Sequence, residues 1–288
     1  YYAFIGKDNI IFHTMIFPAM LKSKGDYILP KNVPANEFLN LEGQKFSKSR
    51  NWSIDLIDFL RDFPDDSSID ALRYTLLMNL PETHDSDFTW RDFQLRNNSE
   101  LAAILGNFVN RTVQFISKNF ETKTPNLTGK YTNFQKEWER AIKYLDDNFS
   151  NDFENAIIPN DFSDILSEND IALIQSLWGG IEKSKYYINK FRIKDSFFEI
   201  MNIARSSNKY FNDEAPWKAI KSDPDYAAKT LYACVQMIYN LAILFAPVIP
   251  STSAKMQNAL NIENIQIGNN TNGEVLQNYW DLAKFANI

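Results

Sequence analysis

Helical periodicity from residue 53 onwards is the feature that most constrains the fold of this chain. Apolar residues recur there at three- and four-residue spacing, which places them on one face of a helix. Prolines separate one periodic segment from the next. Asp70 and Asp213 are expected to lie in first turns or to cap helices. The pattern predicts an antiparallel helical bundle. Its periodic segments are residues 53–63, 68–80, 90–119, 132–149, 168–190, 194–212, 224–246 and 250–261.

The first 50 residues have a different pattern. The chain opens on YYAFIGKDN, which predicts a short buried strand ending at Gly6. An apolar helix follows, with a kink expected at Pro18 and an end at Gly25. Two short strands are expected around a turn at Glu42 and Gly43. A strand, a helix and further strands predict an α/β portion, and the absence of an initiator Met predicts a piece of a longer protein.

Polar composition marks the connections and the end of the chain. Loops are expected at 120–133 and 150–167, and the Asn-rich stretch 263–279 predicts coil or short strands. The length of 288 residues suggests about two domains. The predicted units are an α/β portion at 1–50, a connecting helical segment at 51–92 and a helical bundle at 93–288.

Charge and cysteine content limit the classes of function. The formal net charge of −6 excludes a generally basic nucleic-acid-coating protein, so any polyanion must meet local patches. Cys234 is the only cysteine, which excludes a disulfide framework and a thiolate zinc site in this chain. No apolar run approaching 18 residues and no signal-peptide pattern are apparent, so we predict a cytoplasmic protein with no membrane partner.

The stretch EGQKFSKSRN concentrates positive charge on a predicted turn. Lys45 and Lys48 are three residues apart, so their ammonium groups can contact successive phosphates of one polyphosphate. Hydroxyls such as that of Ser47 can add hydrogen bonds. Phe46 is expected to anchor the loop against the protein. The alternative is a solvated basic hairpin, which explains most isolated K-x-x-K patterns.

A second group of residues lies near the N-terminus. Gly6 allows a close backbone approach to a ligand, and Asp8 can accept hydrogen bonds from ribose hydroxyls. On the following helix, Phe12, His13 and Phe17 fall on neighbouring turns and suit a soft apolar side chain such as that of methionine. Alternatively, the two phenylalanines are ordinary core residues and His13 is a structural histidine.

A third group lies in the helical region. Leu101, Ile104, Leu105, Phe108 and Phe115 form the expected core stripe of one helix. The same helix carries Asn107 and Arg111, which are four residues apart and can contact an unpaired base edge and a phosphate. Trp217 follows Pro216 at the expected start of another helix, where its ring can stack on a base. The alternatives are a surface Asn-Arg pair and a core tryptophan.

The lysine loop resembles the KMSKS signature of class I aminoacyl-tRNA synthetases, with Phe46 in place of the usual Met. Together with FIGKDNIIFH and FPAML, it resembles the methionyl-tRNA synthetase family. The resemblance implies a mainly α chain: the C-terminal remnant of a class I α/β, Rossmann-like catalytic domain at 1–50, a stem-contact-like segment at 51–92 and an anticodon-binding bundle at 93–288.

The resemblance also implies the roles of these residues. Lys48 would stabilise the pyrophosphate leaving group with help from Lys45, and Ser47, Gly6 and Asp8 would complete the ATP contacts. ATP with Mg²⁺, L-methionine and tRNA(Met) would be the substrates. The implied methionine pocket is formed by Phe12, His13 and Phe17, and Phe17 occupies a position at which the family usually has a Trp. The implied anticodon-reading residues are Asn107, Arg111 and Trp217.

The pattern of the family is incomplete in this chain. Its only histidines are His13 and His84, so no HIGH-type motif is present. The resemblance places any zinc site in the missing half of the catalytic domain, and no metal ligand is predicted here. We therefore expect this chain alone not to activate methionine. The alternatives are a non-catalytic tRNA-binding helical module and a structural helical protein without a role in RNA binding.

Overall fold

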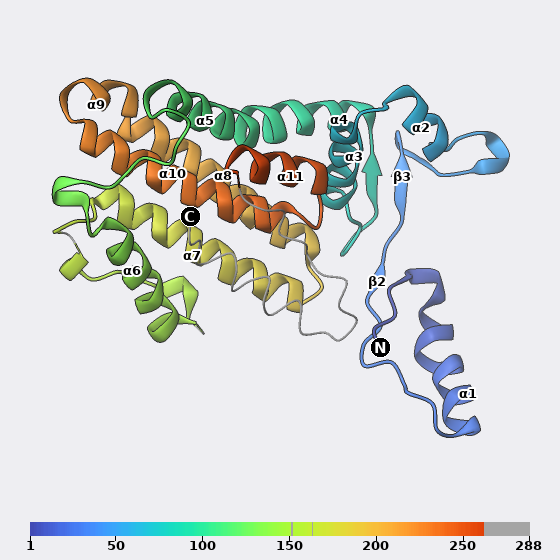
Figure 1. Ribbon diagram of the computed structural model, residues 1–288. Coiled ribbons are helices and arrows are strands. Elements are labelled where there is room, and N and C mark those ends of the chain that lie inside the picture. Colours follow the sequence, from blue (N-terminus) through green and yellow to red (C-terminus); the bar gives the residue numbers. More distant parts are fainter. Residues whose placement is uncertain (151, 163, 262–288) are drawn as a thin grey trace.

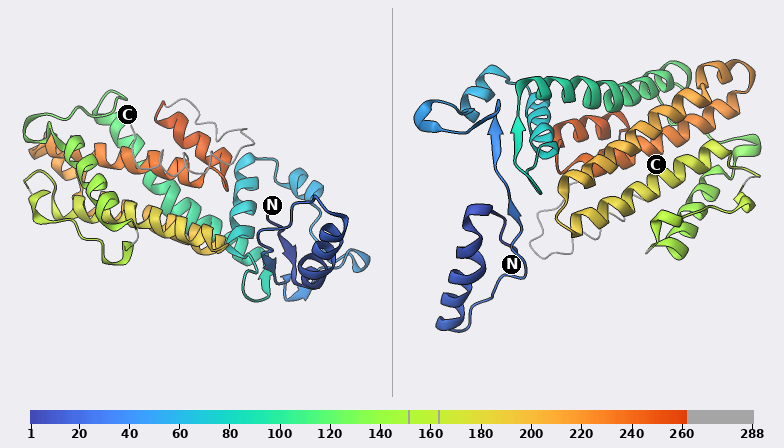
Figure 2. Two further views of the ribbon diagram at one scale, coloured as in Figure 1. Left: turned by 90° about the horizontal axis from the view of Figure 1, so that it is seen from below. Right: turned by 180° about the vertical axis from the view of Figure 1, so that it is seen from behind.

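The computed structural model describes residues 1–150, 152–162 and 164–261. Figure 1 shows a small N-terminal part, from which helix α1 (Phe17–Lys24) projects, joined to a long bundle of helices. Figure 2 shows from behind that α1 and the short helix α9 (Pro216–Ser222) lie at opposite ends of the molecule. The prediction of a mainly helical chain with a small α/β portion is confirmed. The stretch 263–279 lies outside the described residues.

The N-terminal part begins with a short parallel strand pair, β1 (Ile5–Gly6) and β2 (Ala35–Asn36). The expectation of a buried strand is wrong, because β1 is only partly buried and Phe4 beside it is exposed. In the described part of the chain β1 pairs only with β2, so this small sheet offers little surface for burial. The expected kink at Pro18 takes the form of a π-helical turn (Phe12–Ile16) directly before α1.

A second small sheet carries the lysine loop. Its strands are β3 (Leu39–Leu41), β4 (Gln44–Lys45) and β5 (Ser86–Phe88), in the order β4-β3-β5. β3 and β4 form the predicted antiparallel pair. Their two-residue turn, Glu42 and Gly43, has φ values of 49° and 75°, the left-handed conformation that a type I′ hairpin turn requires. β5 runs parallel to β3 and was not predicted, because the tripeptide Ser-Asp-Phe gives no alternating pattern.

The helices follow the predicted segments closely. The stretch 90–119 is continuous but changes to π-helix in its middle, at Asn97–Gly106. Short 3₁₀ turns lie at Lys7–Asn9, Lys48–Arg50, Gly129–Tyr131, Phe153–Asn155 and Asn160–Phe162. Besides α1 and α9, the helices are α2 (Leu56–Asp62), α3 (Asp66–Met78), α4 (Trp90–Arg96), α5 (Asn107–Asn119), α6 (Phe134–Phe149), α7 (Glu168–Asn189), α8 (Ile193–Glu214), α10 (Pro224–Phe245) and α11 (Pro250–Ala259).

Helix α10 is the centre of the main core. Every residue from 227 to 245 except Tyr239 is buried. The expectation that no segment has the length and apolar character of a membrane span is wrong for α10. A helix that is apolar on all sides and surrounded by other helices is the core helix of a bundle, and α10 is buried in this way.

The two predicted loops contribute to the core although their composition is polar. Tyr131 of the first loop and Ile158, Phe162 and Leu166 of the second are buried in the main cluster. Polar composition therefore predicted the absence of long helices but concealed these apolar anchors.

Helix α3 connects the N-terminal part to the bundle. The Asp70 carboxylate is buried and accepts hydrogen bonds from the backbone N–H groups of Ser251 (3.4 Å) and Thr252 (2.6 Å). Asp70 therefore caps a helix as expected, although that helix is α11 and not its own. Asp213 lies in the last turn of α8, so the expectation is wrong for Asp213. The Arg73 guanidinium donates to the carbonyls of Val248 and Pro247 at 2.8 Å each.

Burial of ionisable groups in this core predicts a loss of stability at alkaline pH. Burial raises the pKa of the Cys234 thiol and the pKa of Tyr210 well above their usual ranges. Unfolded Cys ionises near pH 8.5, so above that pH only the unfolded chain releases the proton and the free energy of unfolding falls. Cys234 alone should remove roughly 2 kcal/mol by about pH 10. Guanidinium unfolding at a series of pH values measures this slope, and C234A should flatten it; an equal slope in both proteins would contradict the prediction.

Candidate functional site

The base of the lysine hairpin is fixed to the rest of the protein. The Gly43 N–H donates to both carboxylate oxygens of Asp87, at 2.9 and 2.8 Å, and the Trp90 N–H donates to Glu42 Oε1 at 2.8 Å. On the returning strand, Ser47 pairs with Trp52 through two backbone hydrogen bonds of 2.9 Å. These contacts close residues 42–52 into one compact structure, which we call the lysine hairpin.

Aromatic side chains anchor the lysine hairpin as expected. Phe46 packs against the small cluster formed by Leu41, Phe59, Leu72 and Phe88. The Trp52 indole N–H donates to the Leu41 carbonyl at 2.9 Å. The expectation that Phe46 anchors the loop is confirmed. This anchoring leaves the basic side chains of the loop outside the core.

The basic side chains of the lysine hairpin are exposed. Lys48 opens a 3₁₀ turn that ends at Asn51 in the left-handed conformation, and Ser47 Oγ lies 3.2 Å from Ser49 Oγ. The Lys45 ammonium lies 5.0 Å from the centre of the Phe38 ring. Within residues 1–150, 152–162 and 164–261, no carboxylate forms an ion pair with Lys45 or Lys48. Both ammonium groups are therefore available to an anionic ligand.

Gly6 and Asp8 lie at the end of β1, as predicted. Gly6 has an ordinary extended backbone, with φ −82° and ψ 154°. A Cβ at this position would lie 2.9 Å from Asp8 Oδ1, so a larger residue would displace the exposed Asp8 carboxylate. Between them, Lys7 forms ion pairs with Glu37 and with Asp85 (2.8 Å), and these carboxylates raise the pKa of Lys7. Lys7 thereby ties this strand end to the segments before β3 and β5.

The three aromatic residues predicted on the first helix form one cluster. The rings of Phe12 and Phe17 are stacked, with centroids 6.0 Å apart and planes 12° apart. The His13 ring lies 5.3 Å from Phe12 and 6.4 Å from Phe17. An α-helix would place residues five apart about 140° apart around its axis, whereas the π-helical turn brings them together. Sequence spacing gave no signal for this turn.

His13 is held in one orientation within this cluster. Its Nδ1 lies 3.2 Å from the Asn9 carbonyl oxygen, a contact that places the proton on Nδ1. The ring is only partly buried and Phe12 is exposed. The cluster is therefore an accessible aromatic surface with an Nε2 atom free to form a hydrogen bond.

The structure brings Arg111 and Trp217 together at the other end of the molecule. The Arg111 guanidinium carbon lies 5.4 Å from the centre of the Trp217 ring and 4.6 Å from that of Phe211. Arg111 Nη1 donates to Asn212 Oδ1 at 2.8 Å, and the Phe211 and Trp217 rings are 5.6 Å apart. Trp217 is 37% exposed, so the alternative of a core tryptophan is wrong. We call Arg111, Phe211, Asn212 and Trp217 the arginine–tryptophan patch.

Asn107 lies beside this patch without joining it. It is exposed and begins α5, one turn before Arg111 on the same helix. Among the described residues it forms no hydrogen bond with Arg111 or Trp217. The preceding π-helix sets its direction, because the Asn107 N–H bonds to the Ala102 carbonyl five residues earlier. The expected core stripe of this helix is confirmed, with Leu105 and Phe108 buried and Leu101, Ile104 and Phe115 packed against the core.

Sequence reasoning missed Phe211 and Asn212. Both lie in the last turn of α8, and their place in the patch depends on the packing of α5 against α8. No local pattern predicts which helices pack together. The only available signal was their nearness in sequence to Trp217.

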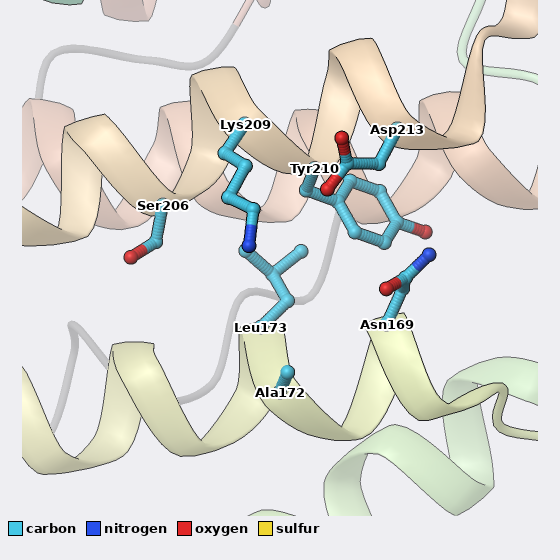
Figure 3. A pocket seen from close by; sticks show the side chains of 7 residues that line it. All are labelled: Asn169, Ala172, Leu173, Ser206, Lys209, Tyr210 and Asp213. Carbon is cyan, nitrogen blue, oxygen red and sulfur yellow. The ribbon is translucent and has the colours of Figure 1, made fainter.

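A group of buried charges lies behind the arginine–tryptophan patch and was also missed. Lys229 of α10, Asp170 of α7 and Glu214 of α8 are all buried, and the Lys229 ammonium contacts both carboxylates. Burial, followed by the carboxylate of Asp170, raises the pKa of Tyr210 beside them. A pocket of about 110 Å³ opens between α7 and α8, where Tyr210 points from α8 towards Asn169 of α7 (Figure 3).

Comparison with known proteins relates the chain to one family of enzymes. The chain is 44% identical over 263 residues to the methionine–tRNA ligase of Phocaeicola vulgatus and 45% identical over 260 residues to that of Bacteroides fragilis. Residues 1–113 match the family model of class I tRNA synthetases (M), and residues 159–280 match that of the anticodon-binding domain of methionyl-tRNA ligase. The chain belongs to the methionyl-tRNA synthetase family.

The alignments cover 91% and 90% of this chain but 33% of each relative, so the chain spans about one third of the curated methionyl-tRNA synthetases that it matches. The structure of Mycobacterium tuberculosis methionyl-tRNA synthetase with methionyl-adenylate is similar, with a TM-score of 0.73 and 25% identity over 92% of this chain and 45% of that protein. The two family models leave residues 114–158 unmatched, and α6 lies within them.

Proposed function

We propose that residues 1–288 form part of a methionine–tRNA ligase, which joins methionine to ATP as methionyl-adenylate and then transfers the methionyl group to tRNA(Met). The observation that carries this proposal is the convergence of Arg111 on the exposed ring of Trp217, far from the lysine hairpin. A basic loop for nucleotide chemistry and a remote aromatic–arginine surface are the two elements that such an enzyme needs in this part of its chain. Family membership supports the assignment.

The lysine hairpin is proposed to act on ATP, supplied with Mg²⁺ as substrate. Lys48 stabilises the charge that develops on the leaving pyrophosphate, and Lys45 and Ser47 contact the same phosphates. Gly6 and Asp8 face the adenosine portion. Exposed, unpaired ammonium groups on an anchored turn support this assignment, because their contacts can form as charge develops in the transition state.

The aromatic cluster of Phe12, His13 and Phe17 is proposed to line the methionine pocket. A thioether packs favourably against ring edges and faces. The stacked pair with its partly exposed faces supports this assignment, and Phe17 keeps an aromatic wall in place of the tryptophan expected there.

Asn107, Arg111 and Trp217 are proposed to contact the anticodon. The Trp217 ring offers a stacking face for an unpaired base, and the Arg111 guanidinium beside it can donate to a base edge or a phosphate. Asn107 extends the same face of α5 by one turn. These few contacts explain how an acidic chain can bind RNA.

The domain division at 50/51 and 92/93 and a cytoplasmic location are parts of the same proposal. We also propose that the reaction requires a further part of the catalytic domain. Because no HIGH-type histidines occur in residues 1–288, these residues alone are proposed to be inactive. Experiments on activity therefore use the complete ligase.

Trp217→Ala in the complete ligase tests the RNA-binding part of the proposal. Loss of one base stack, at about 1–3 kcal/mol, should raise the KM for tRNA(Met) about 5- to 150-fold and leave ATP–pyrophosphate exchange unchanged. Aminoacylation and exchange assays on the same protein separate the two steps.

Phe198→Ala is the matched control for this test. Phe198 is another exposed aromatic residue of the bundle, 47% exposed with the Arg205 guanidinium 5.5 Å from its ring, and neither belongs to a proposed site. Equal effects of the two variants, or equal losses of exchange and charging in Trp217→Ala, would contradict the proposal. RNA binding without exchange activity in the complete protein would favour the non-catalytic alternative.

A further inference from the structure

Three buried charged side chains meet where α7, α8 and α10 come together. The Lys229 ammonium lies 3.0 and 2.9 Å from the two carboxylate oxygens of Asp170 and 3.3 Å from Glu214 Oε2. Lys229 has 0% exposure and its ammonium also lies 4.5 Å from the centre of the Tyr226 ring. We call Lys229, Asp170 and Glu214 the buried charge triad.

Each carboxylate of the triad is also held by neutral donors. Asp170 accepts from the Tyr210 hydroxyl at 2.6 Å and from the backbone and hydroxyl of Ser167 at 2.8 and 2.7 Å. Glu214 accepts from the Asn169 amide at 2.7 Å and from the Tyr226 hydroxyl. Every member therefore has a fixed position relative to three helices.

Stability alone does not account for such a triad. Removing two carboxylates and one ammonium from water is unfavourable, and well-packed apolar groups of the same volume are often at least as stabilising. Buried ionic groups favour one geometry. A carboxylate that moved would lose its hydrogen-bond partners, and no water molecule would be there to replace them. The geometry that this triad fixes is therefore the feature that needs an explanation.

The triad lies directly before the corner that leads to Trp217. Glu214 is the last residue of α8, and Ala215 follows it with φ 43° and ψ 59°. A non-glycine residue in this left-handed conformation is unfavourable by about 1–2 kcal/mol, and such residues persist where the surroundings determine them. Pro216 then begins α9, and Trp217 is the next residue.

The other end of α9 returns to the same triad. Asp223 follows α9 and caps α10 by accepting from the Tyr226 N–H at 3.0 Å. The hydroxyl of Tyr226 donates to Glu214. The seven residues of α9 therefore lie between Glu214 and Tyr226 in the sequence. The hydrogen bond between these two side chains connects the segment before α9 to the segment after it.

From this geometry we infer that Lys229, Asp170 and Glu214 are positioning residues for nucleobase recognition at Trp217. They hold the end of α8 and the start of α10, and so fix the angle at which α9 presents the Trp217 ring beside the Arg111 guanidinium. This inference rests on the proposed function, since it assumes that Trp217 stacks on a base of the anticodon. According to this inference, the selectivity for the anticodon base depends on the buried charge triad as well as on the exposed arginine–tryptophan patch.

Glu214→Gln and Tyr226→Phe in the complete ligase test the inference. Glu214→Gln keeps the shape of the side chain and an acceptor for Asn169 but removes the negative charge, and Lys229 keeps Asp170 as its partner. Tyr226→Phe removes one hydroxyl, and Glu214 keeps Lys229 as its partner. Both variants should raise the KM for a tRNA transcript with a CAU anticodon at least about fivefold, and reduce its preference over a transcript with one changed anticodon base. ATP–pyrophosphate exchange should remain unchanged well below the melting temperature.

Glu199→Gln on the same helix is the control, because its carboxylate contacts Asn202 at 3.4 Å outside the triad. The anticodon preference is the decisive readout, since a general loss of stability would affect both transcripts and both reactions equally. If Trp217→Ala raises the KM but Glu214→Gln and Tyr226→Phe leave the KM and the anticodon preference unchanged, the inference fails and the proposed function stands. If Trp217→Ala also has no effect, both are overturned.

Discussion

Lys48→Ala in the complete ligase is expected to slow methionyl-adenylate formation about 10²- to 10³-fold, or about 2.7–4 kcal/mol of barrier, the scale for one preorganised transition-state contact. The Lys48 side chain is exposed at the start of the 3₁₀ turn and pairs with no carboxylate among the described residues, so its charge is available to the leaving pyrophosphate. Because the contact strengthens as charge develops, the dissociation constant of methionine should hardly change. Pre-steady-state adenylate formation and methionine titration measure the two quantities.

Lys22→Ala provides the control for this loss of charge. Lys22 is an exposed lysine of α1 at the same end of the molecule and belongs to no proposed site, so its replacement should leave the rate within experimental error of the original. A large rise in the methionine dissociation constant for Lys48→Ala would show that its role is misassigned. Residues 1–288 without the rest of the ligase should give no exchange at all, and measurable turnover would overturn that part of the proposal.

The sequence predicted those parts of the fold that depend on local chemistry. Glu42 and Gly43 are a two-residue turn between short strands, and the structure has the same turn with two positive φ values. Phe46, a single apolar residue among charges and hydroxyls, had only one plausible place, against the core. The helices followed from apolar spacing because burial of one face sets their register.

Other features depend on contacts between distant segments and have no local signal. The π-helical turn that stacks Phe12 on Phe17 breaks the regular spacing on which the prediction rests. Asn212 contacts Arg111 across 101 residues of sequence, and Asp70 caps a helix more than 180 residues away. In each case tertiary packing, rather than the preference of the segment itself, selects the partner.

The buried charge triad was the least predictable element and carries the largest expected effect on stability. Lys229→Met should lower the free energy of unfolding by about 3–5 kcal/mol, because it leaves two buried carboxylates without their cation. That is a large part of the 5–15 kcal/mol typical of a folded protein, so the variant should be near its limit of stability. Guanidinium unfolding of the complete ligase, followed by circular dichroism of its helices, measures the change.

Two further variants separate charge from packing. Arg61→Met breaks the 2.9 Å contact with Asp58 on α2, where both side chains are more than half exposed and solvent screens the charges, and should change the free energy of unfolding by less than about 1 kcal/mol. Adding Asp170→Asn and Glu214→Gln to Lys229→Met removes the uncompensated charges and should recover most of the stability. The neutral triple variant should nevertheless keep the reduced anticodon preference, because the carboxylate contacts that fix α9 are gone. A triple variant as unstable as Lys229→Met would show that the lysine acts through its packing volume and not through its charge.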